Sequence, residues 1–337
     1  MSVLEVEGLT KLFPIHRGLL RRRVGDIRAV DDVSFSVAVR ETLGIVGESG
    51  SGKTTVARCL MRLVEPTSGS IRLAVDGASW DVVALQRDEL KAIKRHMQIV
   101  FQDPVSSLDP RMSVGDVIGE GLVLHGMKRR REREARVAEL LDLVGMDPAV
   151  MRRYPHEFSG GQRQRIGIAR ALALGPRVLL CDEPVSALDV SIQAQVLNLF
   201  NRLQRELGLS YLFIAHDLTV VQYVSDRIAV MYLGRVVEVA PAGVLGEQPL
   251  HPYTEALLGA IPLPDPDQDA QPAVKGDIPD PSSPPAGCHF HTRCPYAVEE
   301  CRQREPELRE LRAASRHEVA CHRADELSLA GLHLSRA

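Results

Sequence analysis

Short apolar runs alternate with helical patterns along most of the chain. Four runs have the length of buried strands: residues 42–46, 97–101, 178–181 and 211–215. Four stretches have helical periodicity and separate or follow these runs: residues 55–63, residues 85–96, a helix that opens at 158–162 and runs through Leu172, and a helix that follows Asp189 and runs to Leu207. Strands that alternate with helices predict an α/β fold with a mainly parallel sheet covered on both faces.

Two regions depart from this alternation. Between residues 113 and 153 the spacing is helical throughout, which predicts an α-helical insertion. Near the N-terminus, the apolar positions predict an edge strand that ends near Thr10 and a second strand over residues 30–37. The arginine-bearing segment 17–28 between them predicts a solvated loop, with binding to acidic lipid or to a partner as the alternative.

Composition limits the class of protein. The 337 residues are 45% hydrophobic and 25% charged, as in an ordinary globular protein. A formal net charge of −3 gives no basic surplus, so we expect no nucleic-acid partner. The N-terminus lacks a signal-peptide pattern and no apolar run approaches 18 residues, so we expect a cytosolic chain.

Prolines predict where the α/β domain ends. Eight of the 21 prolines lie between Ile261 and Pro285. Such a stretch is typical of a linker rather than of a packed core. We therefore predict a nucleotide-binding domain over residues 1–260, a linker over 261–285 and a small tail over 286–337.

The sequence GESGSGKT fits the phosphate-loop pattern G-x-x-x-x-G-K-[ST], and it lies between a predicted strand and a predicted helix. Its glycines let backbone N–H groups turn toward a phosphate at the positive end of the following helix. Lys53 would reach the β- and γ-phosphates, and Thr54 would offer its hydroxyl to Mg²⁺. A plain glycine-rich turn is the alternative. The predicted nucleotide-binding residues here are Gly47, Ser49, Gly50, Ser51, Gly52, Lys53, Thr54 and Thr55.

Polar residues stand at the ends of the predicted strands, where ligands of parallel sheets bind. Asp182 would hold Mg²⁺, because hard cations prefer oxygen ligands, and Glu183 would act as a general base toward water. His216 could bond the γ-phosphate, although a lone histidine is more often structural. Gly47, Gln102, Asp182 and His216 all lie at such strand ends, so we expect one shared site.

A second phosphate cradle is predicted at Ser159, Gly160, Gly161 and Gln162, which combine a hydroxyl, glycines and a helix N-terminus. It follows the phosphate loop by about a hundred residues, across the helical insertion. One nucleotide does not need two such cradles from the same subunit. The second cradle therefore predicts a dimer with ATP between the subunits.

Together these motifs resemble the ATP-binding subunits of ATP-binding cassette (ABC) transporters. The resemblance covers residues 1–240 and rests on the phosphate loop, Gln102, FSGGQ at 158–162, Asp182-Glu183, the loop Ser186 to Asp189 and His216. It implies a P-loop NTPase core, mainly parallel with antiparallel N-terminal strands, and an inserted α-helical subdomain over about 103–174. It also implies nucleotide binding by Asp189, and Mg²⁺ and γ-phosphate contacts by Gln102. Phe158 departs from the usual leucine but stays apolar.

The resemblance extends to the oligopeptide/dipeptide importers through GESG at 47–50, FQDP at 101–104 and HPYT at 251–254. It implies a peripheral subunit on the cytoplasmic face of the membrane that hydrolyses ATP to power peptide import. The implied partners are a second ATPase subunit in a heterodimer, two permeases and an extracytoplasmic peptide-binding protein. Import of nickel or another small solute, and a soluble ABC ATPase of DNA repair or translation, are the alternatives.

Two further predictions lie outside the central motifs. Phe13 is a candidate adenine-stacking residue, with a role in the core or a turn equally plausible. The tail holds Cys288, Cys294, Cys301 and Cys321, which could bind Zn²⁺ or an iron–sulfur cluster. The resemblance implies a [4Fe–4S] cluster, with zinc as the alternative and His289, His291, His317 and His322 as possible substitute ligands. A redox-sensing regulator is a further alternative function. Cys59 and Cys181 lie in predicted core elements and are expected to be buried.

Overall fold

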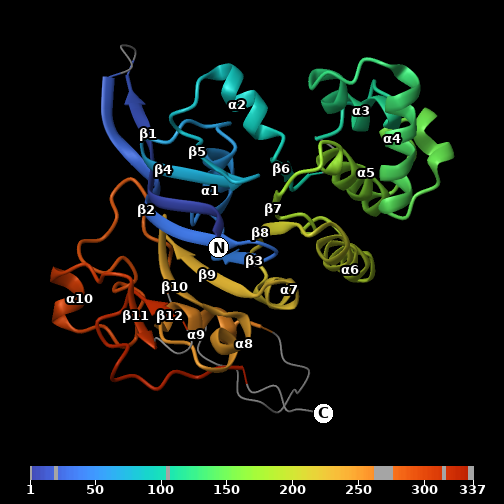
Figure 1. Cartoon of the computed structure of the whole chain (residues 1–337). Coiled ribbons are helices and arrows are strands. Elements are labelled where there is room, and N and C mark those ends of the chain that lie inside the picture. The colour runs from blue at the N-terminus through green and yellow to red at the C-terminus, as the bar shows by residue number, and fades with distance from the viewer. Residues whose placement is uncertain (1, 19–21, 104–106, 262–275, 313–315, 333–337) are drawn as a thin grey trace. The chain divides into compact units, whose positions relative to one another are not determined.

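The computed structural model describes all residues except 1, 19–21, 104–106, 262–275, 313–315 and 333–337 (Figure 1). The chain forms two compact units, each assembled from segments distant in sequence. Unit 1 comprises residues 1–4, 37–41 and 72–214, and unit 2 comprises residues 5–36, 42–71 and 215–337. Part of the predicted linker therefore lies outside the described residues.

Unit 1 is built on three parallel strands. β7 (Val178–Asp182) lies between β6 (Met97–Val100) and β8 (Ser210–Ile214), and all five residues of β7 are buried. The register aligns the carboxyl ends, because Val100 pairs with Cys181 and Asp182 pairs with Ile214. This alignment places the residues that follow β6 and β7 at one edge of the sheet.

The helical insertion of unit 1 forms as predicted. It contains α3 (Val114–Leu124), α4 (Arg130–Leu143) and α5 (Gly160–Leu172), grouped in green to yellow-green in Figure 1. The short turns η1 (Pro148–Arg152) and η2 (Pro155–Glu157) connect α4 to α5. Each helix buries an apolar face, and helix α6 (Val190–Leu207) packs on α5.

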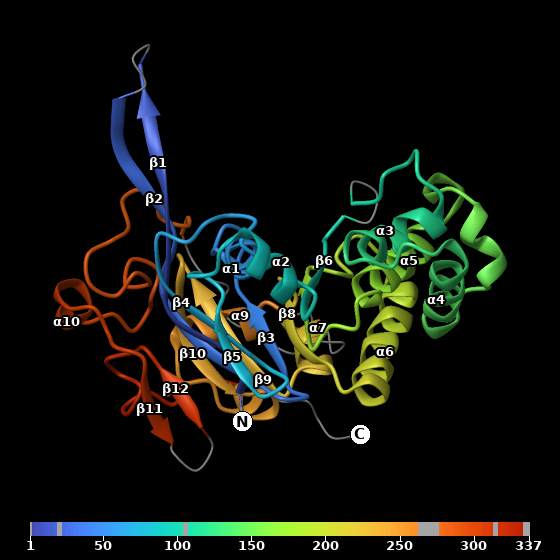
Figure 2. The ribbon, with the colours of Figure 1, turned by 45° about the horizontal axis from the view of Figure 1, so that its top comes forward.

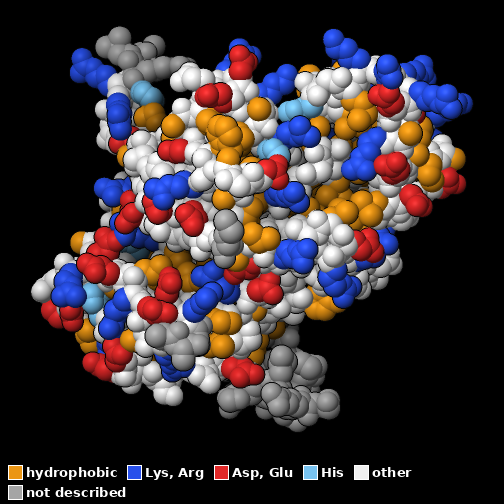
Figure 3. All heavy atoms as spheres, in the orientation of Figure 1, with side chains coloured by type: hydrophobic (Ala, Val, Ile, Leu, Met, Phe, Trp, Pro, Cys, Tyr) orange, Lys and Arg blue, Asp and Glu red, His pale blue; other side chains and the backbone are white. Residues whose placement is uncertain are grey.

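The charge-dense start of α4 is an exposed helix face. Arg129 pairs with Glu132 at 3.0 Å, and Arg130 pairs with Glu134 at 2.8 Å. Figure 3 shows blue and red side chains interspersed over this region. Exposed pairs of this kind contribute little stability, so the face is mainly solubilising.

In unit 2, five strands lie in the order β11-β12-β10-β9-β3. β3 (Thr42–Val46) runs parallel to β9 (Arg227–Tyr232), and β10 (Arg235–Pro241) runs antiparallel to β9. Around them lie four helices: α1 (Lys53–Leu60), α7 (Leu218–Val224), α8 (Ala242–Glu247) and α9 (Pro252–Gly259). Gly44 on β3 is required for this packing, because a Cβ there would lie 2.0 Å from the side chain of Val221 on α7.

The tail adds strands to the same sheet. β12 (His317–Val319) pairs antiparallel with β10, and β11 (Arg309–Arg312) pairs with β12. The short helix α10 (Glu299–Gln303) precedes them. Val319 is fully buried and packs with Leu250. The tail is thereby part of the core of unit 2.

The N-terminal region departs from the prediction. β1 (Ser2–Arg17) continues well past Thr10, and β2 (Arg22–Ala38) begins inside the segment that was expected to be a loop. The two strands neighbour one another and lie side by side in Figures 1 and 2. Their backbone groups can pair with each other without burying side chains, so the polar sequence carried no apolar signal.

A second pair of strands completes the N-terminal sheet. β4 (Ser68–Val75) follows β1 in the strand order, and its last residues pair antiparallel with β5 (Ala78–Asp81) across Asp76-Gly77. Helix α2 (Arg87–Lys94) follows. The predicted antiparallel N-terminal strands are confirmed. None of the described helices is both long enough and apolar enough to cross a bilayer.

Candidate active site

The phosphate loop is shaped by two glycines that no other residue can replace. Gly47 and Gly52 have φ of 154° and 102°. A Cβ would lie 2.1 Å from the carbonyl oxygen of Met231 at the first position, and 2.1 Å from that of Ala29 at the second. The backbone of β9 and β2 therefore lies directly against this loop. Ser49 and Gly50 are exposed at its tip.

Lys53 is held inside this loop. It is the first residue of α1 and is 4% exposed. Its Nζ donates to the carbonyl oxygens of Gly47 at 2.7 Å and Glu48 at 2.9 Å, and to Oγ of Ser51 at 3.3 Å. Thr54 and Thr55 follow in the first helical turn. The N-terminus of α1 and one buried cation thus face the same loop, as an anion site requires.

Glu183 is held in a strained backbone conformation. It directly follows β7 and has a φ of 47°, which a non-glycine residue adopts only where its surroundings enforce it. Its N–H donates to the carbonyl oxygen of Ile214 at 2.9 Å. The preceding Asp182 is buried, with 3% of its surface exposed. Among the described residues, six other non-glycine residues also have positive φ, so the conformation of Glu183 counts toward a functional role only together with its position after β7.

Gln102 and Glu183 meet in unit 1. The amide Nε2 of Gln102 donates to Oε2 of Glu183 at 2.9 Å. The two residues follow the adjacent parallel strands β6 and β7. Gly47 and His216 belong to unit 2, so the single shared site stays a prediction. A carboxylate oriented by an amide has the geometry of a base with its positioning group.

The second cradle begins helix α5. Ser159 caps this helix, with its Oγ accepting from the N–H of Gln162 at 3.4 Å, while Oε1 of Gln162 accepts from the N–H of Ser159 at 3.0 Å. Gly160 and Gly161 form the first turn. Phe158 is buried beneath the Arg153 guanidinium, which lies 4.6 Å from the ring centroid. The apolar role expected of Phe158 is confirmed.

Asp189 also caps a helix. Its carboxylate accepts from the N–H of Ile192 at 2.9 Å at the start of α6, and that bond lowers the pKa of the carboxyl. Two other predicted residues lie in unit 2. His216 is exposed in the loop before α7, and Phe13 is exposed on β1 with the Lys11 ammonium 5.0 Å from its ring centroid. Their predicted contacts with ATP stay predictions.

The four tail cysteines line one cavity in unit 2, together with His291 and His322. Burial raises the pKa of Cys288 to about 12 and that of Cys321 to about 11, and it also raises the pKa of Cys294. Within the described part of the chain, no three cysteine, histidine or acidic residues are arranged to hold one metal ion. The four thiols therefore line a common cavity, but they are not arranged as the ligands of one metal ion.

The candidate histidine ligands have other partners. Nε2 of His317 lies 2.7 Å from Oε1 of Glu238, with both side chains fully buried. Nε2 of His322 lies 2.8 Å from the carbonyl oxygen of Arg304, and Nδ1 of His291 lies 2.9 Å from that of Cys288. His289 does not line the cavity. These contacts favour the cysteines as the ligand set.

The remaining cysteines are buried, as predicted. Cys59 and Cys181 are fully buried. Burial raises the pKa of Cys59 to about 11 and raises that of Cys181 well above its ordinary value. Such thiols are inert at neutral pH.

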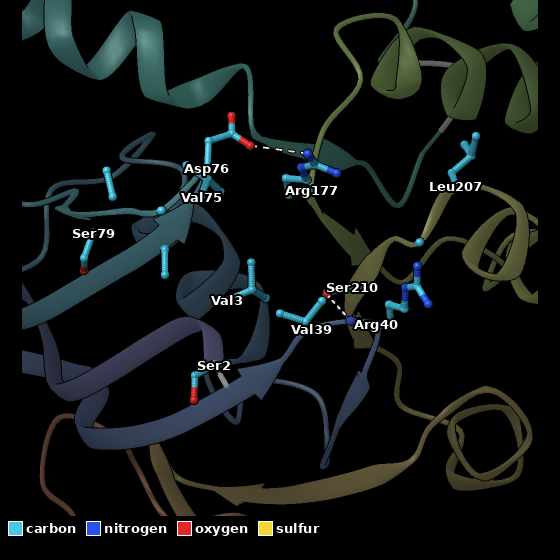
Figure 4. A pocket seen from close by; sticks show the side chains of 14 residues that line it. Ser2, Val3, Val39, Arg40, Val75, Asp76, Ser79, Arg177, Leu207 and Ser210 are labelled. Carbon is cyan, nitrogen blue, oxygen red and sulfur yellow. Dashed lines mark hydrogen bonds and ion pairs between the residues drawn. The ribbon is translucent and has the colours of Figure 1, made fainter.

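A separate cavity of about 400 Å³ lies in unit 1 and contains none of the predicted site residues (Figure 4). Arg177 and Asp76 form a 3.3 Å ion pair at its wall, and Arg40 lies on another side. Both partners of the ion pair are more than half exposed.

Sequence reasoning missed the contacts that the phosphate-loop residue Glu48 makes with two residues distant in the chain. The carboxylate of Glu48 is bound by the guanidinium of Arg293, and its N–H donates to Oη of Tyr253 at 2.8 Å. The pair with Glu48 raises the pKa of Arg293 above its ordinary value. Tyr253 belongs to the HPYT motif, but nothing in that motif indicates a contact with a loop some two hundred residues earlier.

The comparisons with known proteins agree with this geometry. The family model described as "ABC transporter" matches residues 30–186, and the model described as "Oligopeptide/dipeptide transporter, C-terminal region" matches residues 237–301. The chain is 51% identical to the oligopeptide transport ATP-binding protein AppF of Bacillus subtilis (strain 168), over 95% of this chain and 97% of that protein. This chain belongs to the ABC transporter family.

Solved structures confirm the ABC-ATPase fold. The dimeric post-hydrolysis ATP-binding cassette MJ0796 with ADP and Pi is 28% identical, with a TM-score of 0.60 over 71% of this chain and 98% of that chain. CbiO1 of Clostridium perfringens, part of the ABC transporter complex cbiONQ, gives a TM-score of 0.59 at 28% identity, over 72% of this chain and 89% of that chain. Membership of the ABC transporter family implies ATP with Mg²⁺ as the nucleotide ligand.

Proposed function

We propose that this ABC ATPase hydrolyses ATP to power the import of peptides through a membrane permease. The observation that carries the proposal is the strained Glu183, whose carboxylate Gln102 orients at 2.9 Å. The match to the oligopeptide/dipeptide C-terminal region and the similarity to AppF support peptides as the cargo.

The residues divide the chemistry between them. Lys53 and the loop N–H groups bind the β- and γ-phosphates, and Glu183 accepts a proton from the attacking water. Asp182 and the hydroxyl of Thr54 are oxygen donors that fit Mg²⁺, and the amide oxygen of Gln102 is a third candidate. Mg²⁺ bound by these oxygens would supply positive charge against the phosphates. His216 positions the water, and Phe13 stacks on adenine.

The signature residues serve a second subunit. Ser159 to Gln162 present two glycine N–H groups at the start of α5, where a γ-phosphate of the partner's ATP would bind. Closure of the dimer moves the permease, and hydrolysis with product release reopens it. We propose a heterodimer at the cytoplasmic face of the membrane, with two permease subunits and an extracytoplasmic peptide-binding protein.

A Glu183→Gln variant in the assembled transporter tests this function. The amide keeps the shape of the side chain but cannot take a proton, so ATP binding should persist while hydrolysis and uptake of labelled peptide fall by about 10²-fold or more. Glu206→Gln is the control, because Glu206 is exposed on α6 away from the motifs. Unchanged hydrolysis in Glu183→Gln would refute the assignment of Glu183 as the general base. Uptake of nickel instead of peptide would refute peptides as the transported substrate.

We propose that Cys288, Cys294, Cys301 and Cys321 hold a [4Fe–4S] cluster. A zinc ion needs its ligands to converge at about 2.3 Å, whereas a cluster takes one thiolate at each iron. The four thiols line one shared cavity, and the resemblance to the peptide importers favours the cluster over zinc. Four bonds between cysteine sulfur and iron would cross-link the tail. Anaerobic purification should yield iron and sulfide with visible absorption, and Cys301→Ser should lose both. Stoichiometric zinc with no iron would favour the alternative.

A further inference from the structure

Glu48, the second residue of the phosphate loop, is bound by the cysteine-bearing tail. Nη1 of Arg293 donates to Oε2 of Glu48 at 2.7 Å, and Nη2 donates to Oε1 at 2.9 Å. The Arg293 side chain is 5% exposed and the Glu48 side chain is 25% exposed. A bidentate, largely desolvated pair of this kind is among the stronger polar contacts in proteins. It joins residues 245 positions apart in the chain.

Aromatic rings fix the guanidinium in place. Arg293 lies 5.7 Å from the ring centroid of Tyr232 on β9 and 6.0 Å from that of Phe290 in the tail. Tyr253 on α9 packs against both rings, with centroids 4.7 Å and 5.4 Å away. The same Tyr253 accepts the N–H of Glu48. Side chain and backbone of Glu48 are therefore held by one cluster.

The contacts continue from Glu48 to the phosphate-binding lysine. The carbonyl oxygen of Glu48 accepts from Nζ of Lys53 at 2.9 Å. Arg293 thus acts on Glu48, and Glu48 contacts the cation that is to meet the phosphates. Arg293 also offsets the negative charge of Glu48, which would otherwise repel an incoming triphosphate.

Arg293 is placed by the fold of the cysteine segment. It lies between Cys288 and Cys294, and its N–H donates to the carbonyl oxygen of Phe290 at 3.0 Å. The N–H of Cys288 donates to the carbonyl oxygen of Cys301 at 2.8 Å. Phe290 lines the cysteine cavity and also contacts the guanidinium. The cavity and the phosphate-loop contact therefore belong to one folded segment.

We propose that Arg293 is a positioning residue of the ATP site, through which the C-terminal tail sets the affinity of the phosphate loop for ATP. The inference rests on the proposed ATPase function. It adds to that function a residue outside the nucleotide motifs and a role for the tail in nucleotide binding.

The test uses the full chain, with the dissociation constant measured by equilibrium binding of a fluorescent ATP analogue and with KM and kcat for ATP. Arg293→Ala should raise both the dissociation constant and KM by about tenfold, with a smaller change in kcat, because the carboxylate of Glu48 is left uncompensated. Arg293→Lys should recover part of this loss, since it keeps the charge but not the bidentate geometry.

The double variant separates charge compensation from a merely structural role. Glu48→Gln with Arg293→Ala should bind ATP more tightly than Arg293→Ala alone, because the repelling charge is gone. Arg309→Ala is the control, since Arg309 pairs with Asp325 in the tail and not with the loop. Thermal unfolding shows whether each variant is folded, and Arg293→Lys carries the test if Arg293→Ala is not.

Three results would overturn the inference: wild-type affinity in folded Arg293→Ala, no recovery in the double variant, or an equal loss in Arg309→Ala. The dissociation constant, unlike KM and kcat, is measured without turnover. A wild-type protein that binds ATP but does not hydrolyse it would thus refute the proposed function while leaving this test intact.

Discussion

Gly161 serves packing as well as the nucleotide signature. A Cβ there would lie 2.4 Å from Cγ2 of Ile192 on α6. We expect Gly161→Ala to lower the free energy of unfolding by about 1–3 kcal/mol, because the clash must be relieved by moving packed helices. Denaturant unfolding measures the change.

Gly167→Ala on the same helix is the matched control, because nothing lies within 4 Å of a Cβ there. Alanine should be neutral or should stabilise the helix by up to about 1 kcal/mol. Equal losses of stability in the two variants would contradict the steric explanation of Gly161.

Individual site residues were predictable where a sequence motif ties a residue type to a known chemical role. Lys53, Asp182 and Glu183 were identified from residue type and from their place beside a strand. The positive φ of Glu183 was not, since no residue-type pattern signals a strained glutamate. The pair of Arg293 with Glu48 was also missed, because contacts over such a separation depend on tertiary structure that local patterns do not contain.

Among the secondary-structure elements, β10 is the one that joins the tail to the core. Its Glu238 is fully buried and accepts from the N–H groups of Leu250 at 2.6 Å and His251 at 3.0 Å, and it pairs with His317 on β12. We expect Glu238→Ala to lower the free energy of unfolding by about 3–5 kcal/mol, because the buried partners lose their acceptor. Thermal unfolding and proteolysis of the tail measure the effect.

A second variant separates this role from a general effect of losing an acidic residue. Glu318→Ala removes a half-buried glutamate from β12, the strand that pairs with β10. It should change stability by about 0.5 kcal/mol or less. A tail that stays protected from protease in Glu238→Ala would show that other contacts hold it.

Strands were predictable from the sequence in proportion to how far they are buried. β7 and β8, buried at every residue, match the predicted apolar runs. The exposed parts of β1 and β2 carry no apolar pattern, so the first strand was predicted too short and the second too late. β12 has three residues, too few for any periodicity to be read.

At the scale of the whole molecule, the sequence predicted the ABC-ATPase fold because its motifs lie at the ends of strongly apolar strands. It also suggested a tail separated from the ATPase by a proline-rich segment. The structure instead adds β12 to the sheet of unit 2 and brings Arg293 to the phosphate loop. Pairing between distant segments accounts for the difference, and composition does not reveal it.

The guanidinium that reaches Glu48 has a practical consequence for laboratory work on this enzyme. Shortening the gene after α9, to produce a minimal cassette, would delete the partner of Glu48 together with the four tail cysteines. Kinetic constants measured on such a fragment would describe a phosphate loop whose Glu48 has lost its buried partner.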